Sequence, residues 1–270
     1  MSEAIVAVIL GIVEGLTEFL PISSTGHLIL ACPLLHVDLE EPFWKSFIYF
    51  IQIGAILAVV VYSWRHLWRL TFHAPQKGAR HHIFTKLLAA FLPAAVLGLL
   101  FNDIMERYLE WAVPVALALM IGAVLIEVIE RKYRRPVTHT VEEITLRQAF
   151  LIGLCQCIAM IPGTSRSGAT IMGGLVVGLS APAATEFSFF LAIPTIVAAG
   201  SYSLFKHHEA LNTEHAVTLA IGFVVSFLVA WAVVAWFLRY IRTHSFRIFV
   251  VYRLTLGAIV LAWYLRARGQ

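Results

Sequence analysis

The sequence predicts an all-α polytopic membrane protein, built as an inverted-topology repeat with six full transmembrane helices and two re-entrant helix–loop–helix segments. Three observations lead to this fold class. The 270 residues are 60% hydrophobic and only 13% charged, about half the charged share of a typical soluble domain. Six apolar runs approach the length of about 20 residues that a helix needs to cross a bilayer. Two further apolar stretches are interrupted by proline, glycine and hydroxyl residues.

The six uninterrupted runs are the predicted full spans. They lie at 46–63, 85–101, 112–130, 186–205, 217–238 and 248–266. The interrupted stretches, 4–36 and 149–178, divide into pieces of roughly 10–13 residues, which are too short to span. Each is therefore predicted to enter and leave on one side, an arrangement tolerated only where the loop faces protein or a polar cavity.

One re-entrant segment followed by three spans occurs twice, which divides the chain into repeats at 1–136 and 137–270. Weak internal similarity supports this division. The stretch GIVE at 11–14 aligns with GLCQ at 153–156, and STG at 24–26 aligns with RSG at 166–168 with the same offset of 142 residues. An odd number of spans per repeat inverts the second copy in the membrane. Transporters with such repeats bind their ligands where broken helices meet near the midplane.

Basic and acidic residues fall on opposite sides of the predicted topology. The basic loops are 64–86, 131–147 and 239–247, with Arg65, Arg69, Lys77, Arg80, Lys86, Arg131, Lys132, Arg134, Arg135, Arg147, Arg239, Arg242 and Arg247. The opposite loops carry Asp38, Glu40, Glu41, Asp103, Glu106, Glu110, Glu209 and Glu214. The positive-inside rule places the basic loops in the cytoplasm, although Arg266 and Arg268 fall on the other side. Because the basic residues lie in these loops, the net charge of +4 does not indicate nucleic-acid binding.

The first interrupted segment carries Glu14, Glu18 and His27 in the stretch EGLTEFLPISSTGH at 14–27. A charge at the bilayer centre costs about 2.5–3.5 kcal/mol, so these groups and Arg166 must meet one another or water. Glu14 and Glu18 lie four residues apart on one helix face, where two like charges need a cation or a proton. A divalent metal, Mg or Ca, bound by Glu14 and Glu18 meets this need. The alternative is that one glutamate only orients Arg166 in a structural ion pair.

Hydroxyl residues follow in the same segment. Pro21 ends the first half-helix, and Ser23, Ser24 and Thr25 are candidate N-caps for the returning helix. His27 lies in the first turn of that helix. A lone buried histidine is more often a satisfied core residue, but the acidic and hydroxyl neighbours favour a role as catalytic acid, base or nucleophile.

The second interrupted segment contains IPGTSRSGAT at 161–170, a turn of small residues that opens a helix at about residue 168. A helix N-terminus favours an anion, and the guanidinium fork of Arg166 matches phosphate oxygens. With Ser23, the hydroxyls of Ser165, Ser167 and Thr170 complete a predicted phosphate-binding site. The alternative is a tight turn with a structural arginine.

A few other polar residues lie within or beside the predicted spans. We expect structural roles for Glu127, Glu130, Glu186 and Arg253, and Arg253 is placed where it can snorkel toward the interface. Gln52 and Gln156 are candidates to line the cavity.

At its two loops the sequence resembles the undecaprenyl-diphosphate phosphatase family, bacterial membrane proteins linked to bacitracin resistance. The likeness covers essentially the whole chain and is carried by EGLTEFLPISSTGH and PGTSRSGAT. It implies an inner-membrane enzyme, dependent on a divalent metal, that removes the terminal phosphate of undecaprenyl diphosphate on the periplasmic side. That reaction recycles the lipid carrier for peptidoglycan synthesis. The family's functional positions correspond here to Glu14, Glu18, Ser23, Ser24, His27, Ser165, Arg166 and Thr170.

These groups predict phosphoanhydride hydrolysis, with a catalytic set of Glu14, Glu18, Ser24, His27 and Arg166. Arg166 and the hydroxyls are expected to hold the terminal phosphate and stabilise the developing charge. His27 is favoured as the base and Ser24 is a candidate nucleophile, while direct attack by His27 or by water stays open. The prenyl tail is expected to lie between helices, in lipid.

The competing hypothesis is a polyprenyl-phosphate flippase or an anion transporter that uses the same central cavity. Inverted repeats with broken helices are a transporter design, and Arg166 would then bind the transported anion. A homodimer is also considered, because the sequence neither requires nor excludes one.

Overall fold

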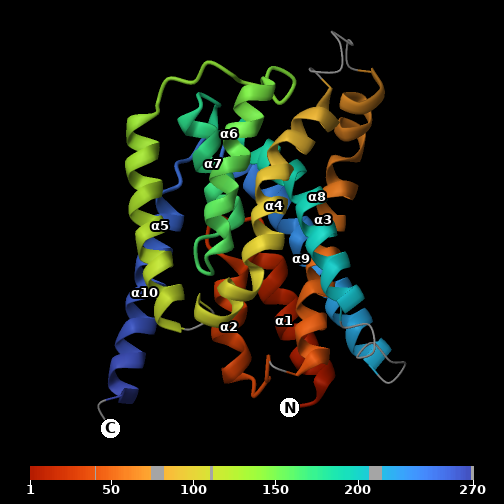
Figure 1. Cartoon of the computed structure of the whole chain (residues 1–270), viewed down its shortest axis with the longest axis vertical. Helices are drawn as coiled ribbons and strands as arrows, with labels where there is room; N and C mark the ends of the chain where they lie inside the picture. Colours follow the sequence, from red (N-terminus) through yellow and green to blue (C-terminus); the bar gives the residue numbers. More distant parts are fainter. Residues whose placement is uncertain (40, 74–81, 110–111, 207–214, 269–270) are drawn as a thin grey trace.

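The computed structural model describes residues 1–39, 41–73, 82–109, 112–206 and 215–268, and this part of the chain is helical apart from its connections (Figure 1). One isolated bridge, between Thr138 and Leu179, is its only β-type pairing. The helices are α1 Glu3–Thr17, α2 Ser24–Leu34, α3 Pro42–Trp68, α4 Ile83–Leu109, α5 Ala112–Lys132, α6 Leu146–Gln156, α7 Arg166–Val176, α8 Ala181–Lys206, α9 Ala216–Tyr240 and α10 Arg247–Arg268.

Six of these helices, α3, α4, α5, α8, α9 and α10, are long and apolar enough to cross a membrane. They confirm the six predicted spans; α5 begins at the predicted residue, and the other helices extend beyond both predicted ends, α4 by eight residues at its C-terminal end. Large apolar side chains cover their outer surfaces, and Leu99 of α4 is 76% exposed. A soluble protein rarely exposes apolar surface on this scale, so these surfaces fit a polytopic membrane protein.

The two interrupted stretches form pairs of short helices, as predicted. In Figure 1, α1 and α2 enter from the end of the bundle that holds both termini, and α6 and α7 enter from the opposite end. The connecting loops meet inside the bundle, where the Ser167 hydroxyl donates to the Leu20 carbonyl over 2.7 Å. The helix–loop–helix form is therefore confirmed, while re-entrant insertion into a bilayer stays a prediction.

The two loops share an unusual local geometry. Ser23 and Ser165 precede α2 and α7, and both have positive φ, 71° and 78°. Positive φ is uncommon for residues other than glycine. Each serine accepts a hydrogen bond from a backbone N–H three residues on, at Gly26 and Gly168. These pairs are again 142 residues apart, which supports an internal repeat, although its division at residue 136 stays a prediction.

Close helix contacts hold the short helices in place. Gly11 on α1 faces α9, and Gly153 on α6 faces α4; neither position leaves room for a Cβ. Because a glycine at these points lets two backbones approach closely, the first helix of each pair is held against a full span. The two glycines are also equivalent in the proposed repeat.

Arg253 on α10 ties both loops to the bundle. Its side chain is fully buried and donates to the carbonyls of Pro21, Gly163 and Thr164 in the loops and of Ala118 and Leu119 in α5. The expected structural role is consistent with this, but the expectation that Arg253 snorkels is wrong. An inward guanidinium can donate five hydrogen bonds, and the three loop carbonyls among its acceptors have no other backbone donor in the described part of the chain.

The end of the bundle opposite the termini carries the basic ends of α3 and α5 and the α9–α10 connection. Some residues of the predicted charge distribution lie outside the described residues: Glu40, Lys77, Arg80, Glu110, Glu209 and Glu214.

Candidate active site

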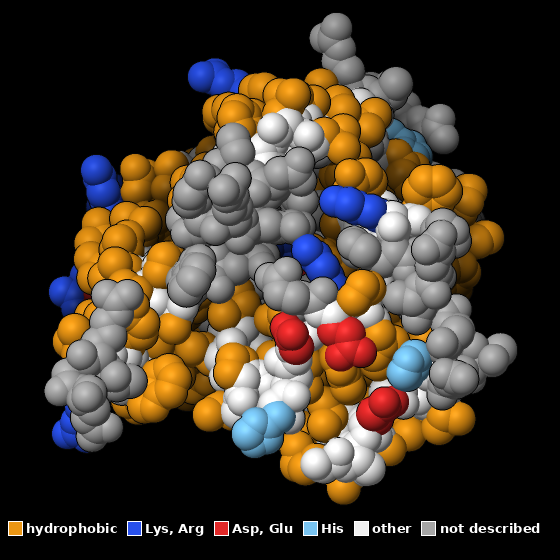
Figure 2. Space-filling view, turned by 60° about the horizontal axis from the view of Figure 1, so that its bottom comes forward, with side chains coloured by type: hydrophobic (Ala, Val, Ile, Leu, Met, Phe, Trp, Pro, Cys, Tyr) orange, Lys and Arg blue, Asp and Glu red, His pale blue; other side chains and the backbone are white. Residues whose placement is uncertain are grey.

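A cavity of about 640 Å³ lies where the two loops meet. Polar residues of both loops line one part of it, and α3, α4 and α8 form its walls. It extends to Lys45 in the first turn of α3 and to Lys206 at the end of α8. Figure 2 shows lysine or arginine side chains in a hollow on this face, with acidic side chains beside them. The cavity therefore extends toward the end that holds the termini, away from the basic loops.

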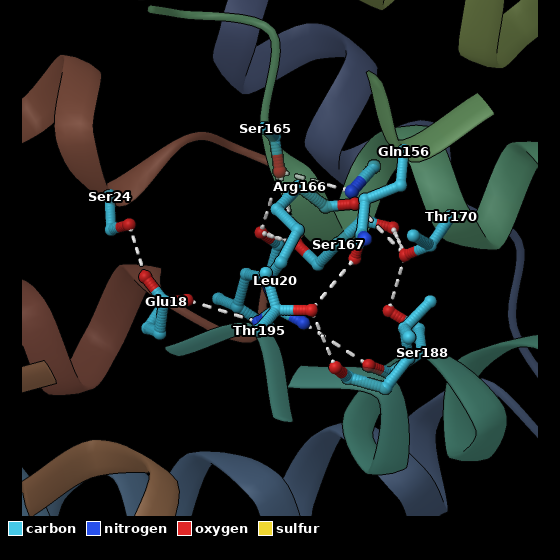
Figure 3. A network of polar contacts seen from close by, with 12 residues as sticks. Glu18, Leu20, Ser24, Gln156, Ser165, Arg166, Ser167, Thr170, Ser188 and Thr195 are labelled. Carbon is cyan, nitrogen blue, oxygen red and sulfur yellow. Dashed lines mark hydrogen bonds and ion pairs between the residues drawn. The ribbon is translucent and has the colours of Figure 1, made fainter. Parts of the chain in front are cut away.

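Glu18, Ser24 and Arg166 form the polar centre of the cavity (Figure 3). The Nη2 atom of Arg166 lies 3.0 Å from Oε1 of Glu18, and the two side chains are 12% and 7% exposed. The other oxygen of Glu18 accepts a hydrogen bond from the Ser24 hydroxyl. Arg166 also donates to the Ser188 carbonyl over 3.1 Å. One carboxylate thus joins a hydroxyl of the first loop to a guanidinium of the second.

Local sequence explains why these groups meet. Glu18 lies one residue after the end of α1, and Ser24 and Arg166 are the first residues of α2 and α7. All three stand at the inner end of a short helix, and Ser24 and Arg166 each follow an N-cap serine directly. The predicted meeting of the charged groups of both segments is therefore observed for Glu18 and Arg166.

Glu14 lies one helical turn before Glu18 and is fully buried. Neither of its carboxylate oxygens has a hydrogen-bond partner among the described residues. A buried carboxylate without partners is costly unless it binds a proton or a cation. Glu14 does not line the cavity itself, but its two free oxygens make it a candidate ligand next to Glu18. The described part of the chain contains no group of three or more His, Cys, Asp or Glu side chains placed to hold a metal ion.

The predicted phosphate-binding hydroxyls fall into two groups. Ser23 and Ser165 line the cavity and also cap α2 and α7. Ser167 and Thr170 are buried behind Arg166 and do not line it. Ser167 donates to Leu20, and the Thr170 hydroxyl contacts both the Arg166 carbonyl and the Ser188 hydroxyl. In this arrangement Ser167 and Thr170 hold the loop and Arg166 in place.

His27 lies on a different face of α2. Its Nδ1 atom is 2.7 Å from the Ser23 carbonyl, and its Nε2 atom is 2.7 Å from the Tyr252 hydroxyl. The ring stacks on Tyr252 of α10 and does not line the cavity. The structure therefore does not bring His27 to Glu18 and Arg166, and its catalytic role stays a prediction.

Several residues of the site could not be selected from the sequence. Ser188 contacts Arg166 from the next helix, and Tyr252 contacts His27 from a helix 225 residues on; no motif marks either residue. Lys45 and Lys206 occupy the ends of predicted spans, where a basic residue is ordinary. Gln52 and Gln156, which the sequence predicts as candidates, do line the cavity. The signal in the sequence that marks these two residues is a polar side chain inside an apolar run.

The cavity can bind an anion. Among the described residues, Arg166, Lys45 and Lys206 line it with one carboxylate, that of Glu18, so this part of the lining is positive. Its walls also include apolar residues of α4 and α8, among them Phe91, Leu99 and Ile196. A ligand with a charged head and an apolar chain matches both parts.

Comparison with known proteins shows the family of the chain. Residues 7–259 match the family model described as "Bacitracin resistance protein BacA". A protein of Albidiferax ferrireducens named undecaprenyl-diphosphatase is 49% identical over 260 residues, 95% of this chain and 93% of that protein. The undecaprenyl-diphosphatase of Nitrosospira multiformis is 50% identical over 94% of this chain and 92% of its own length. Undecaprenyl-diphosphatase 2 of Rhodospirillum rubrum is 51% identical over 95% of this chain and 93% of its own length. The chain belongs to the bacitracin resistance protein BacA family.

Proposed function

We propose that the protein is an integral membrane undecaprenyl-diphosphate phosphatase. It hydrolyses undecaprenyl diphosphate to undecaprenyl phosphate and inorganic phosphate, and so supplies the lipid carrier for peptidoglycan synthesis and confers bacitracin resistance. The observation that carries this proposal is the Ser24–Glu18–Arg166 network, which faces a positively charged cavity with apolar walls. The names of the relatives support the same substrate.

The geometry favours Ser24 as the nucleophile and Glu18 as its base. The Ser24 hydroxyl already donates to Glu18, so the proton can pass to the carboxylate as Oγ attacks the terminal phosphorus. The bond from that phosphorus to the bridging oxygen breaks, and undecaprenyl phosphate leaves. Water then hydrolyses the phosphoserine and releases inorganic phosphate. Arg166 stabilises the charge on the phosphoryl oxygens.

We expect Glu14 and Glu18 to hold a divalent cation, Mg or Ca. Carboxylate oxygens are ligands that both ions prefer, and the two free oxygens of Glu14 lack any other partner among the described residues. When bound, the ion neutralises charge on the diphosphate. Calorimetric titration of metal into chelator-treated protein tests this: Glu14→Gln is expected to weaken binding at least tenfold, whereas binding equal to the parent refutes the assignment.

His27 is assigned here as a positioning residue, because its ring bridges the Ser23 carbonyl on the catalytic loop and Tyr252 on α10. The alternative is that His27 rotates into the cavity as the base. Tyr252→Phe separates the two roles. If His27 is a positioning residue, Tyr252→Phe and His27→Gln should each lower kcat in part without moving the pH profile of kcat. If His27 is the catalytic base, Tyr252→Phe should keep the full activity of the parent while His27→Gln is inactive.

The lipid tail and the orientation complete the proposal. The first prenyl units lie against the apolar walls of α4 and α8, and the rest of the chain lies in lipid. The positive-inside rule places the basic end in the cytoplasm, so the cavity opens to the periplasmic side of the bacterial inner membrane. A homodimer stays an expectation, to be measured by light scattering of the purified protein.

Transport of a polyprenyl phosphate or another anion is the second candidate, favoured by the central cavity between paired short helices. Detergent-purified protein separates the two functions, because a micelle has no sides for transport. We expect release of inorganic phosphate from undecaprenyl diphosphate with added Mg or Ca, and loss of that release in Glu18→Ala. No release with either metal by folded protein would reject the phosphatase and favour transport.

A further inference from the structure

A second cavity, of about 580 Å³, lies at the basic end of the bundle, opposite the end that the candidate active site faces. It is formed by the C-terminal end of α5, the start of α8 and the start of α10. The proposed hydrolysis does not use it. We call it the basic-end pocket; its lining residues used below are Glu127, Glu130, Arg131, Tyr133, Arg134, Leu175, Leu179, Phe246 and Arg247.

The pocket has unmatched positive charge. Its two glutamates are already engaged: Glu127 pairs with Arg131, and Glu130 accepts the backbone N–H of Phe246 over 2.9 Å. The side chains of Arg134 and Arg247 make no hydrogen bond or ion pair with any residue that the structure describes. The Glu130 carboxylate acts on Arg134 electrostatically, and the three lining arginines still outnumber the two glutamates by one. Arg134 lies two residues after the end of α5 and Arg247 is the first residue of α10, and the planar forks of both match phosphate oxygens.

The surroundings of the pocket are those of a membrane interface. Leu175, Leu179 and Phe246 form a buried apolar floor, and Tyr133 at the edge is 37% exposed. Tyrosine is enriched at the level of lipid headgroups. Just beyond the pocket, α5 exposes Val128 and α10 exposes Val251, apolar surfaces on which acyl chains can lie. The arginines match an anionic headgroup and the apolar surfaces match acyl chains.

We propose that the basic-end pocket binds the phosphate headgroup of an anionic phospholipid from the adjacent leaflet, with Arg134 and Arg247 on the phosphate. Basic pockets between transmembrane helices at a cytoplasmic face are typical sites for anionic headgroups. A bound lipid would bridge α5 and α10, the two helices that Arg253 also joins to the catalytic loops.

Native mass spectrometry of the detergent-purified protein tests the proposal. The probes are dioleoyl phosphatidylglycerol and dioleoyl phosphatidylcholine, which share acyl chains and differ in headgroup charge. We expect at least fivefold preferential retention of one phosphatidylglycerol, and at least a fivefold loss of that preference in the double variant Arg134→Gln/Arg247→Gln. The matched control is Arg239→Gln/Arg242→Gln, which removes the same charge from exposed positions at the same end but outside the pocket; it should stay within twofold of the parent.

Equal retention of the two lipids, or equal loss in both double variants, overturns the proposal. Displacement of phosphatidylglycerol by 10 mM inorganic phosphate, on the order of cellular anion levels, would also overturn it in favour of a free-anion site. Should the pocket double variant melt below the parent, the single variants replace it, each with a partial loss expected. Lipid retention is measured without turnover, so this test fails or succeeds independently of the proposed phosphatase activity. Phosphate release by both double variants should stay within twofold of the parent.

Discussion

The hydrogen bonds by which Arg253 holds both loops against α5 are called the Arg253 clamp here. Loss of this clamp should both destabilise the protein and slow its reaction. Three of the five carbonyls that Arg253 binds, at Pro21, Gly163 and Thr164, lie in the two loops outside any helix. None of these three accepts another backbone hydrogen bond among the described residues. Arg253→Met fills much of the volume but leaves these acceptors without donors.

The expected loss of unfolding free energy follows from the number of carbonyls left without a donor. A buried acceptor left without its partner costs about 1–3 kcal/mol, so three of them cost roughly 3–6 kcal/mol if the loops relax in part. This is a large share of a typical stability of about 5–15 kcal/mol. The loops also carry Ser24 and Arg166, and a misplacement of about 1 Å at a reacting group lowers turnover on the order of a hundredfold.

Thermal unfolding in detergent and phosphate release from undecaprenyl diphosphate are the two measurements. Arg253→Lys is the matched variant, because an ammonium keeps the charge but has three donors for five carbonyls; it should fall between the parent and Arg253→Met in both assays. A methionine variant with the parent's melting temperature and turnover within twofold would show that the clamp does not hold the loops.

The other predictions concern single contacts around the same loops. Gly122→Ala should lower the melting temperature and the turnover as the Arg253 variants do, because a Cβ there would overlap the Arg253 guanidinium. An alanine variant with the melting temperature and turnover of the parent would contradict this geometry. Arg166→Lys should lower kcat about 10²–10³-fold, as the loss of one transition-state donor does, since one ammonium cannot reach both Glu18 and the Ser188 carbonyl; turnover within threefold of the parent would refute the role. Ser165→Ala should cost about 0.5–2 kcal/mol in unfolding free energy and Ser165→Gly only a few tenths, because glycine tolerates the positive φ; a glycine variant less stable than the alanine variant would argue against the cap.

Much of the fold could be predicted from the sequence because bilayer thickness imposes a length. Six runs such as 46–63 and 217–238 are long and apolar, and the structure has a helix over each. Proline, glycine and serine at 21–26 and 162–168 divide the remaining apolar stretches into helices too short to span. The cost of buried charge then required Glu18 and Arg166 to meet, and they do.

The tertiary structure decided which way each polar side chain points and what it contacts. Hydropathy places Arg253 and His27 along their helices but does not fix the rotation of those helices in the bundle. Arg253 turned out to face inward, where it binds both loops, and His27 faces Tyr252, 225 residues away, outside the cavity. Such partners come from packing between distant helices, which leaves no local pattern in the sequence. For the same reason the free oxygens of Glu14 and the arginines of the basic-end pocket became visible only in three dimensions.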